Sequence, residues 1–275
     1  MNNCDQKLPQ FRNPPVIETV LGVYFRELEK FNSAEQGIFW DRYFRTKFPN
    51  LEERPPTEEL RERFGEDRLV PGADIRWRVS QRPDTPRLWA ASQDGQHVIQ
   101  IQRNGFLTNW LKSNDGVTYK SFGEKRLELA NKLGQLNEFL QDRTIGQIKP
   151  TSWVVTYINH IDYEGLDNVG PSVADIITTW TNTYSDDWLV SPDNLVLDIA
   201  FPMPSNAGRL NVKLTPVFEN KSKQHKLRLE LTARGQQEFK DLESLLLSID
   251  LGHEWVVRGF TSLTRPEMHK LWERV

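Results

Sequence analysis

The sequence predicts an α+β protein in which antiparallel sheets carry helices on one face and the order of elements occurs twice. Three observations support this prediction. Apolar and polar residues alternate with a period of two, as Ile99 and Ile101 do with Gln100 and Gln102, which is typical of half-buried strands. Capping-box patterns precede segments with helical apolar spacing. The order of strand, helix, three strands and helix appears in both halves of the chain.

The first half follows a leader over residues 1–12 that we expect to be flexible. Residues 16–25 follow two prolines and read as a strand. Glu18 is unusual inside it, and it is interpreted either as a functional carboxylate or as a solvated or paired structural acid. Ser33, with Gln36 three residues later, predicts the start of a helix.

The rest of the first half contains a charged connection, three strands and a second helix. Residues 50–74 are rich in Glu, Arg and Pro, which predicts an exposed connection with a short helix after Thr57. Apolar and polar residues alternate over 75–79, which predicts a half-buried strand. The Asp94-Gly95 turn signal predicts a hairpin over 87–112. Ser121, with Glu124 at the third helical position, predicts a long amphipathic helix.

The second half starts at Pro150 and repeats this order. Residues 151–161 are rich in β-branched and aromatic residues and predict a strand. Ser172 and Asp175 predict a helix that continues through Trp180. Alternation then predicts three further strands, and helices follow to the C-terminus. The predicted strands cover 195–201, 210–214 and 227–231.

The repeated order divides the chain into a half over 13–149 and a half over 150–275. An internal duplication or a chance agreement of a six-element order would explain the repeat. Each half would form a four-stranded sheet, and the polar faces could join as one broad curved surface. The candidate binding residues on that surface are Arg76, Arg78, Gln100, Gln102, Arg103, Lys213, Arg228 and Glu230.

Composition limits the classes of protein and partner. The net charge of −3 and the pI near 6.0 give no global basic field that would recruit nucleic acid. The single cysteine, Cys4, excludes an internal disulfide and favours a reducing compartment. No apolar run reaches the roughly 18 residues of a membrane span, and we expect no export signal. These observations predict a cytoplasmic protein.

Motifs for catalysis are missing from the sequence. There is no His-x-x-x-His, Cys-x-x-Cys, Gly-x-Ser-x-Gly or phosphate-binding glycine loop. His160 and Asp162 would share one strand face, where a hydrogen-bonded surface pair is favoured over a metal site. The sequence therefore predicts no catalytic residue, metal ligand or cofactor, and it favours a protein that is not an enzyme.

Three segments resemble a sporadically distributed, uncharacterised bacterial family of similar length. They are Asn13-Pro-Pro-Val-Ile-Glu-Thr-Val-Leu-Gly-Val-Tyr-Phe25, Val98-Ile-Gln-Ile-Gln-Arg-Asn-Gly-Phe-Leu-Thr-Asn-Trp110 and Trp153-Val-Val-Thr-Tyr-Ile-Asn159. The C-terminal segment 253–264 is also similar, whereas Leu111 stands where the family more often has a basic residue. The resemblance implies no activity, and its patchy occurrence implies a bacterial defence or conflict locus.

Three functions compete on these grounds. A protein-binding module, antitoxin-like or accessory to a defence locus, would use the polar sheet face or an open edge strand to bind a protein encoded alongside. A nucleic-acid-binding protein would use the arginines of the same face. A hydrolase with an unrecognised site is the third alternative. An exposed edge strand would also permit a homodimer.

Overall fold

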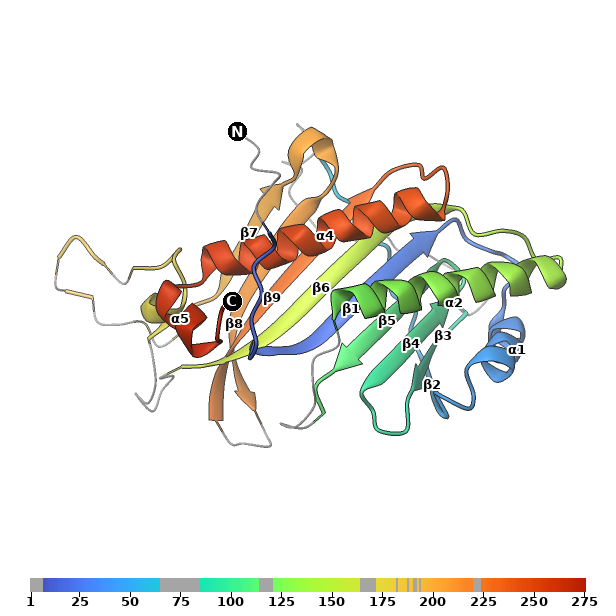
Figure 1. Cartoon of the computed structure of the whole chain (residues 1–275), viewed down its shortest axis with the longest axis horizontal. Coiled ribbons are helices and arrows are strands. Elements are labelled where there is room, and N and C mark those ends of the chain that lie inside the picture. The colour runs from blue at the N-terminus through green and yellow to red at the C-terminus, as the bar shows by residue number, and fades with distance from the viewer. Residues whose placement is uncertain are drawn as a thin grey trace.

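The structure, a computed structural model, places nine strands in one antiparallel sheet in the order β2-β3-β4-β5-β1-β6-β9-β8-β7 (Figure 1). It describes residues 7–64, 85–113, 121–163, 172–181, 183–186, 188–189, 192, 194–219 and 224–275. The strands are β1 (Val16–Phe25), β2 (Asn50–Arg54), β3 (Arg87–Ala91), β4 (His97–Gln102), β5 (Gly105–Leu111), β6 (Pro150–Asp162), β7 (Leu197–Pro202), β8 (Arg209–Glu219) and β9 (Gln224–Gln236).

The described residues also form five α-helices. These are α1 (Ser33–Tyr43), α2 (Phe122–Asp142), α3 (Val173–Ile176), α4 (Leu242–Leu263) and α5 (Pro266–Leu271). The predicted α+β class and the antiparallel strand arrangement are confirmed. Within the described residues, no helix is both long and apolar enough to cross a membrane.

The two predicted halves share one sheet rather than forming two. Strands β1 and β6 pair antiparallel from Val16 opposite Asn159 to Phe25 opposite Pro150. Each of these strands would otherwise leave a row of backbone donors and acceptors unpaired, so pairing them satisfies both edges.

The long helices α2 and α4 lie side by side across one face of the sheet (Figure 1). Helix α4 packs on β6 and β9, and α2 packs on β1 and β5. Trp153 of β6 is 1% exposed, and Gly252 of α4 lies against its ring so closely that an added Cβ would overlap it. The Nε of Arg126 donates to Asp250 at 2.7 Å and joins the two helices. Helix α1 packs against α2, with the rings of Phe39 and Phe139 5.2 Å apart.

The N-cap side chains of α2 and α1 accept hydrogen bonds from backbone N–H groups in the first turn of each helix. Ser121 and Glu124 form the predicted reciprocal capping box at the start of α2. Helix α1 begins at Ser33, but its N-cap is Asn32, whose side chain accepts from the backbone N–H of Glu35 at 3.1 Å. Asparagine one residue earlier therefore supplies the cap that was predicted for Ser33.

Several predicted boundaries are wrong. Residues 50–54 form strand β2, paired with β3 at the sheet edge, instead of a connection. Residues 55–64 contain no helix, and α3 ends at Ile176 because Ile177 is already extended. A turn at Arg103-Asn104 divides 97–111 into two strands, β4 and β5. The predicted strand over 75–79 lies outside the described residues.

Candidate functional site

The face of the sheet opposite α2 and α4, here called the polar face, carries the candidate site. Because side chains alternate along a strand, Trp153 and Val155 of β6 contact α4, whereas Thr156 points to the polar face. Thr156 lies directly opposite Thr232 of β9, and the two hydroxyl oxygens are 2.9 Å apart. Asn211 of β8 is the next partner of Thr232.

A groove of about 420 Å³, here called the polar groove, lies over this floor. Its floor is built from short polar side chains of β6, β9 and β8, and its walls come from β7 and from the chain after β2. The lining residues are Tyr24, Glu58, Leu60, Ser152, Trp153, Val154, Thr156, Asp198, Asn211, Lys213, Glu230, Thr232 and Arg234.

One wall of the groove is an extended segment over 55–64, here called the strap. Thr57 is held by Gln102 of β4, whose Oε1 accepts from the Thr57 N–H and whose Nε2 donates to the Thr57 carbonyl, both at 3.0 Å. Glu59 accepts from the hydroxyls of Thr151 and Ser152 at 2.9 and 2.8 Å. The strap therefore crosses the polar face from the first half of the chain to β6.

Glu62 fastens the other end of the strap to the second half. Its carboxylate, in a residue only 6% exposed, accepts from Arg209 Nη1 at 2.5 Å, from Asn211 Nδ2 at 3.0 Å, and from Arg234. Gln236 donates to the Glu62 carbonyl at 3.0 Å. A buried carboxylate needs such partners to offset its lost hydration, so this cluster fixes the strap on the sheet.

The polar face of the first half carries a row of hydrogen bonds across four strands. Arg87 of β3 donates to Gln100 of β4, Gln100 donates to Asn109 of β5 at 2.7 Å, and Asn109 donates to Glu18 of β1 at 2.6 Å. Glu18 is therefore a paired acid at the end of a structural network. Burial, and then the nearby Arg54, lower the pKa of the Arg87 guanidinium.

An aromatic ring on the same face has two cations close to it. Trp89 is directly opposite Gln100, and the guanidinium carbons of Arg54 and Arg87 lie 3.9 and 5.5 Å from its ring centroid. Such contacts stabilise a cation over an aromatic face. The described polar face therefore contains an aromatic ring with two arginines beside it.

The candidate residues from the sequence are dispersed over this face. Lys213 and Glu230 line the polar groove, and Arg228 pairs with Glu230 at 2.8 Å.

Gln100 and Gln102 were expected on an uncovered surface but are 4% and 1% exposed, because Arg87 and the strap cover them. Arg103 lies in the β4–β5 turn and donates to the Glu29 carbonyl at 2.9 Å. Arg76 and Arg78 lie outside the described residues.

Sequence reasoning missed Glu62, Arg209 and Arg234. Arg209 lies one residue before the predicted strand 210–214, and Arg234 lies three residues after the predicted strand 227–231. Extending the alternation of those strands would have found both. Glu62 had no such signal, because a Glu- and Arg-rich segment has the composition of a solvated connection.

The lining of the groove carries charged side chains of both signs. The described lining contains acids and bases but neither histidine nor cysteine. Lys213 and Asp198 form an exposed pair at 3.8 Å, and such a pair contributes only up to about 1 kcal/mol. Both side chains can therefore re-pair with charges of a partner at low cost.

The structure gives no support to a metal at His160. Its Nδ1 lies 3.9 Å from Glu219, and Asp162 pairs with Lys226 instead. In the described part of the chain, no three His, Cys, Asp or Glu side chains form a group that could hold a metal ion.

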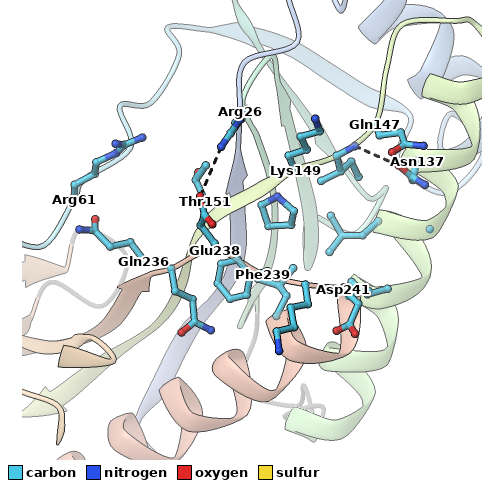
Figure 2. Close-up of a pocket in the computed structure, with 18 residues that line it drawn as sticks. Arg26, Arg61, Asn137, Gln147, Lys149, Thr151, Gln236, Glu238, Phe239 and Asp241 are labelled. Atoms are coloured by element: carbon cyan, nitrogen blue, oxygen red, sulfur yellow. Dashed lines mark hydrogen bonds and ion pairs between the residues drawn. The ribbon is translucent and has the colours of Figure 1, made fainter. Parts of the chain in front are cut away.

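A second, wider cleft of about 900 Å³ lies between the C-terminal part of α2 and the start of α4 (Figure 2). Arg61 of the strap lines this cleft, whereas Glu58 and Leu60 line the polar groove, so the strap is a shared wall. Asp241 caps α4 by accepting from Ser244 N–H at 2.8 Å, and Asn137 accepts from Ile148 N–H at 3.2 Å. These polar side chains have structural roles.

The chain matches no family model, and it matches none of the curated proteins.

Proposed function

We propose that the protein is a non-enzymatic binding module that holds a segment of another protein in the polar groove. The observation that carries this proposal is the exposed Lys213–Asp198 pair beside Glu230 over a floor of threonines. Mixed charges at a groove rim select a partner by complementary charge. Short hydroxyl side chains leave room for an extended chain and can hydrogen-bond its backbone.

Strand β7 offers a second means of holding an extended segment. It is the last strand in the sheet order, and its residue Asp198 lines the groove. An edge strand can add a partner strand through backbone hydrogen bonds. A bound segment would then contact the β7 edge and the groove together.

We further propose that the module consists of two related halves whose helices share one face of the sheet. The strand order from β1 outward is β1-β5-β4-β3, and from β6 outward it is β6-β9-β8-β7. A long helix follows β5 in one half and β9 in the other. Duplication of one strand-helix-strands-helix unit would produce this order.

The type of partner follows from the resemblance to the sporadic bacterial family. By that analogy the partner is a protein encoded alongside, and the module is antitoxin-like or accessory to a defence locus. This step rests on the resemblance, whereas the groove itself rests on the geometry.

A charge-reversal experiment tests the proposal. Tagged wild-type protein, Lys213→Glu and Lys270→Glu are used to capture proteins from native-host extract, and quantitative mass spectrometry identifies each set. Lys270 is an exposed lysine of α5, remote in sequence from the groove strands. We expect one partner to be captured by wild type and Lys270→Glu and to be lost from Lys213→Glu. Purified partner must then bind with the same ranking in a two-component assay.

The proposal fails if wild type captures no partner that binds in that assay, or if Lys213→Glu binds it equally. A second charge reversal, Glu230→Lys, tests whether the acid at the same rim also contributes to binding of the partner. Folding of each variant is verified by circular dichroism and thermal unfolding.

Nucleic-acid binding is the second candidate, and the Arg54–Trp89–Arg87 stack favours it. Single strands are bound by cationic surfaces with aromatic rings that stack on bases. Fluorescence anisotropy with 20-nucleotide RNA and DNA at low and high salt tests it. Binding that weakens with salt and with Arg54→Ala, together with no protein partner, would reverse the order of the two candidates.

A further inference from the structure

A pocket of about 620 Å³, here called the apolar pocket, lies on the helix side of the sheet, away from the polar groove. It is enclosed by the N-terminal segment 8–16, the start of α2, strands β6 and β9, and helix α4. Phe11, Phe122, Val256 and Phe260 supply apolar wall. Its volume falls within the range of roughly 300–1,000 Å³ that is typical of small-molecule sites.

Three polar side chains converge on this pocket. The hydroxyl of Tyr157 lies 3.0 Å from Nδ1 of His253, and the ring of Phe122 stacks on His253 with centroids 3.7 Å apart. Asn159, which is 3% exposed, donates to the Leu229 carbonyl at 3.1 Å. A few fixed polar groups among apolar walls are what orients a ligand in such sites.

The described lining of the pocket carries no ionised side chain. It contains no Asp, Glu, Lys or Arg. Burial, and then the nearby Lys125, lower the pKa of His253 to about 4, so His253 is neutral at pH 7. Lys125 lies outside this lining, so an ion entering the pocket would lose hydration without gaining a counter-charge from the walls.

The C-terminal end of the described chain holds the N-terminal wall of the pocket. Arg12 and Asn13 donate backbone hydrogen bonds to the carbonyls of Glu273 and Trp272 at 3.1 and 3.2 Å. Phe11 packs edge-on against Phe260, with ring centroids 5.4 Å apart. These contacts fix the position of the N-terminal wall on α4 and the C-terminal residues.

We propose that the apolar pocket binds a small, uncharged organic molecule with an aromatic body and a hydrogen-bonding group. Phe11, Phe122, Tyr157, His253 and Phe260 surround the pocket with aromatic rings, which favour stacked or edge-on contact with another ring. The Tyr157–His253 pair and Asn159 face the polar end of the ligand. This site is separate from the polar groove and does not depend on its function.

Two related fluorescent probes test the site and its preference for uncharged ligands. N-phenyl-1-naphthylamine is uncharged, and 8-anilinonaphthalene-1-sulfonate has the same rings with an added sulfonate. We expect saturable binding of the uncharged probe with a stoichiometry of one. The sulfonate should bind at least about tenfold more weakly, because its charge must be desolvated.

Variants locate the binding. Val257→Trp places a large ring in the pocket, and it should weaken binding of the uncharged probe at least about tenfold. Leu247→Trp is the matched control, because Leu247 is 58% exposed on the same helix and lies outside the pocket lining. The control should bind as wild type does.

Gly123→Leu is a second filling variant that covers the case in which Val257→Trp does not fold. An added Cβ at Gly123 meets no atom within 4 Å, and Gly123 lines the pocket. The proposal is overturned by the absence of saturable binding, by equal affinity for the two probes, or by wild-type affinity in a folded filling variant.

Discussion

The carboxylate of Glu62 accepts a hydrogen bond from Arg209 at 2.5 Å, although 147 residues separate the two in the chain. Both residues are buried, at 6% and 8% exposure. The contact joins a strap that follows β2 to a strand of the second half. It therefore links the halves on the polar face, while β1 and β6 link them within the sheet.

Glu62→Gln should release the strap. The variant removes the negative charge and leaves Arg209 and Arg234 facing each other near a neutral amide. Removing one partner of a buried ion pair costs about 3–5 kcal/mol, and local opening of the strap would limit the measured loss to less than this. We expect faster trypsin cleavage after Arg61 and Arg63 and a lower free energy of unfolding in urea.

Glu52→Gln is the control for that variant. Glu52 pairs with Arg54 at 2.7 Å, but its side chain is 63% exposed, and exposed pairs contribute up to about 1 kcal/mol. Wild-type cleavage and stability are expected. Equal effects of the two substitutions would show that the Glu62 cluster does not hold the strap.

The strap shows why part of the candidate site was not predictable. The side chains of Gln100 and Gln102 were correctly assigned to one face by their alternation, but their burial depends on Arg87 and Thr57. A period-two pattern identifies a polar face, but it does not reveal which other segment covers that face. The charged composition of the strap predicted an exposed connection. Nothing in the sequence distinguishes the buried Glu62 from the solvated acids around it.

Asn109→Ala should break the hydrogen-bond row on the first half of the polar face. Asn109, 6% exposed, accepts from Gln100 and donates to Glu18. The substitution leaves the buried amide of Gln100 without its acceptor, at a cost of about 1–3 kcal/mol. The measurement is the urea midpoint at an unchanged slope.

Asn50→Ala provides the comparison. Asn50 also makes a hydrogen bond, to the Ser92 carbonyl at 3.2 Å, but at an exposed position, so its loss should change stability by less than about 0.5 kcal/mol. If the two variants are equally stable, the hydrogen-bond row contributes no more to the free energy of unfolding than an exposed hydrogen bond does.

Two glycines in the long helices should respond in opposite directions to alanine. At Gly252 an added Cβ would overlap the Trp153 ring and lie 3.0 Å from Val155, so Gly252→Ala should cost about 1–3 kcal/mol. At Gly134 the added Cβ meets nothing within 4 Å, and alanine should stabilise the helix by about 1 kcal/mol. Thermal unfolding measures both, and a stabilising Gly252→Ala would contradict the close packing of α4 on β6.

The helices and strands were predictable where a local signal sufficed. The Ser121–Glu124 capping box marks the start of α2 because both partners lie within four residues. Pairing of β1 with β6 joins segments more than 100 residues apart, and alternation within either strand does not identify its neighbour. The β4–β5 turn was missed although Asn104-Gly105 is a turn dipeptide. Ile101 pairs with Phe106, so the core-facing residues change from odd to even numbers across the turn.

The pH dependence of stability should reveal the buried His253. Its pKa is lowered from 6.5 to about 4 in the folded protein, so between these values the unfolded chain binds a proton that the folded protein does not. The contribution of His253 to the free energy of unfolding is complete above pH 6.5 and is lost as the pH falls towards 4, with a slope of at most about 1.4 kcal/mol per pH unit.

His253→Gln should unfold with a shallower pH dependence across this window. At pH 7.5, where the ring is neutral in both states, the two proteins should differ only by the contacts of the ring, including its hydrogen bond with Tyr157. Parallel stability curves from pH 7 to 4.5 would mean that His253 is protonated as readily in the folded protein as in the unfolded chain, and that its environment is wetter than the packing of Phe122 and Tyr157 implies.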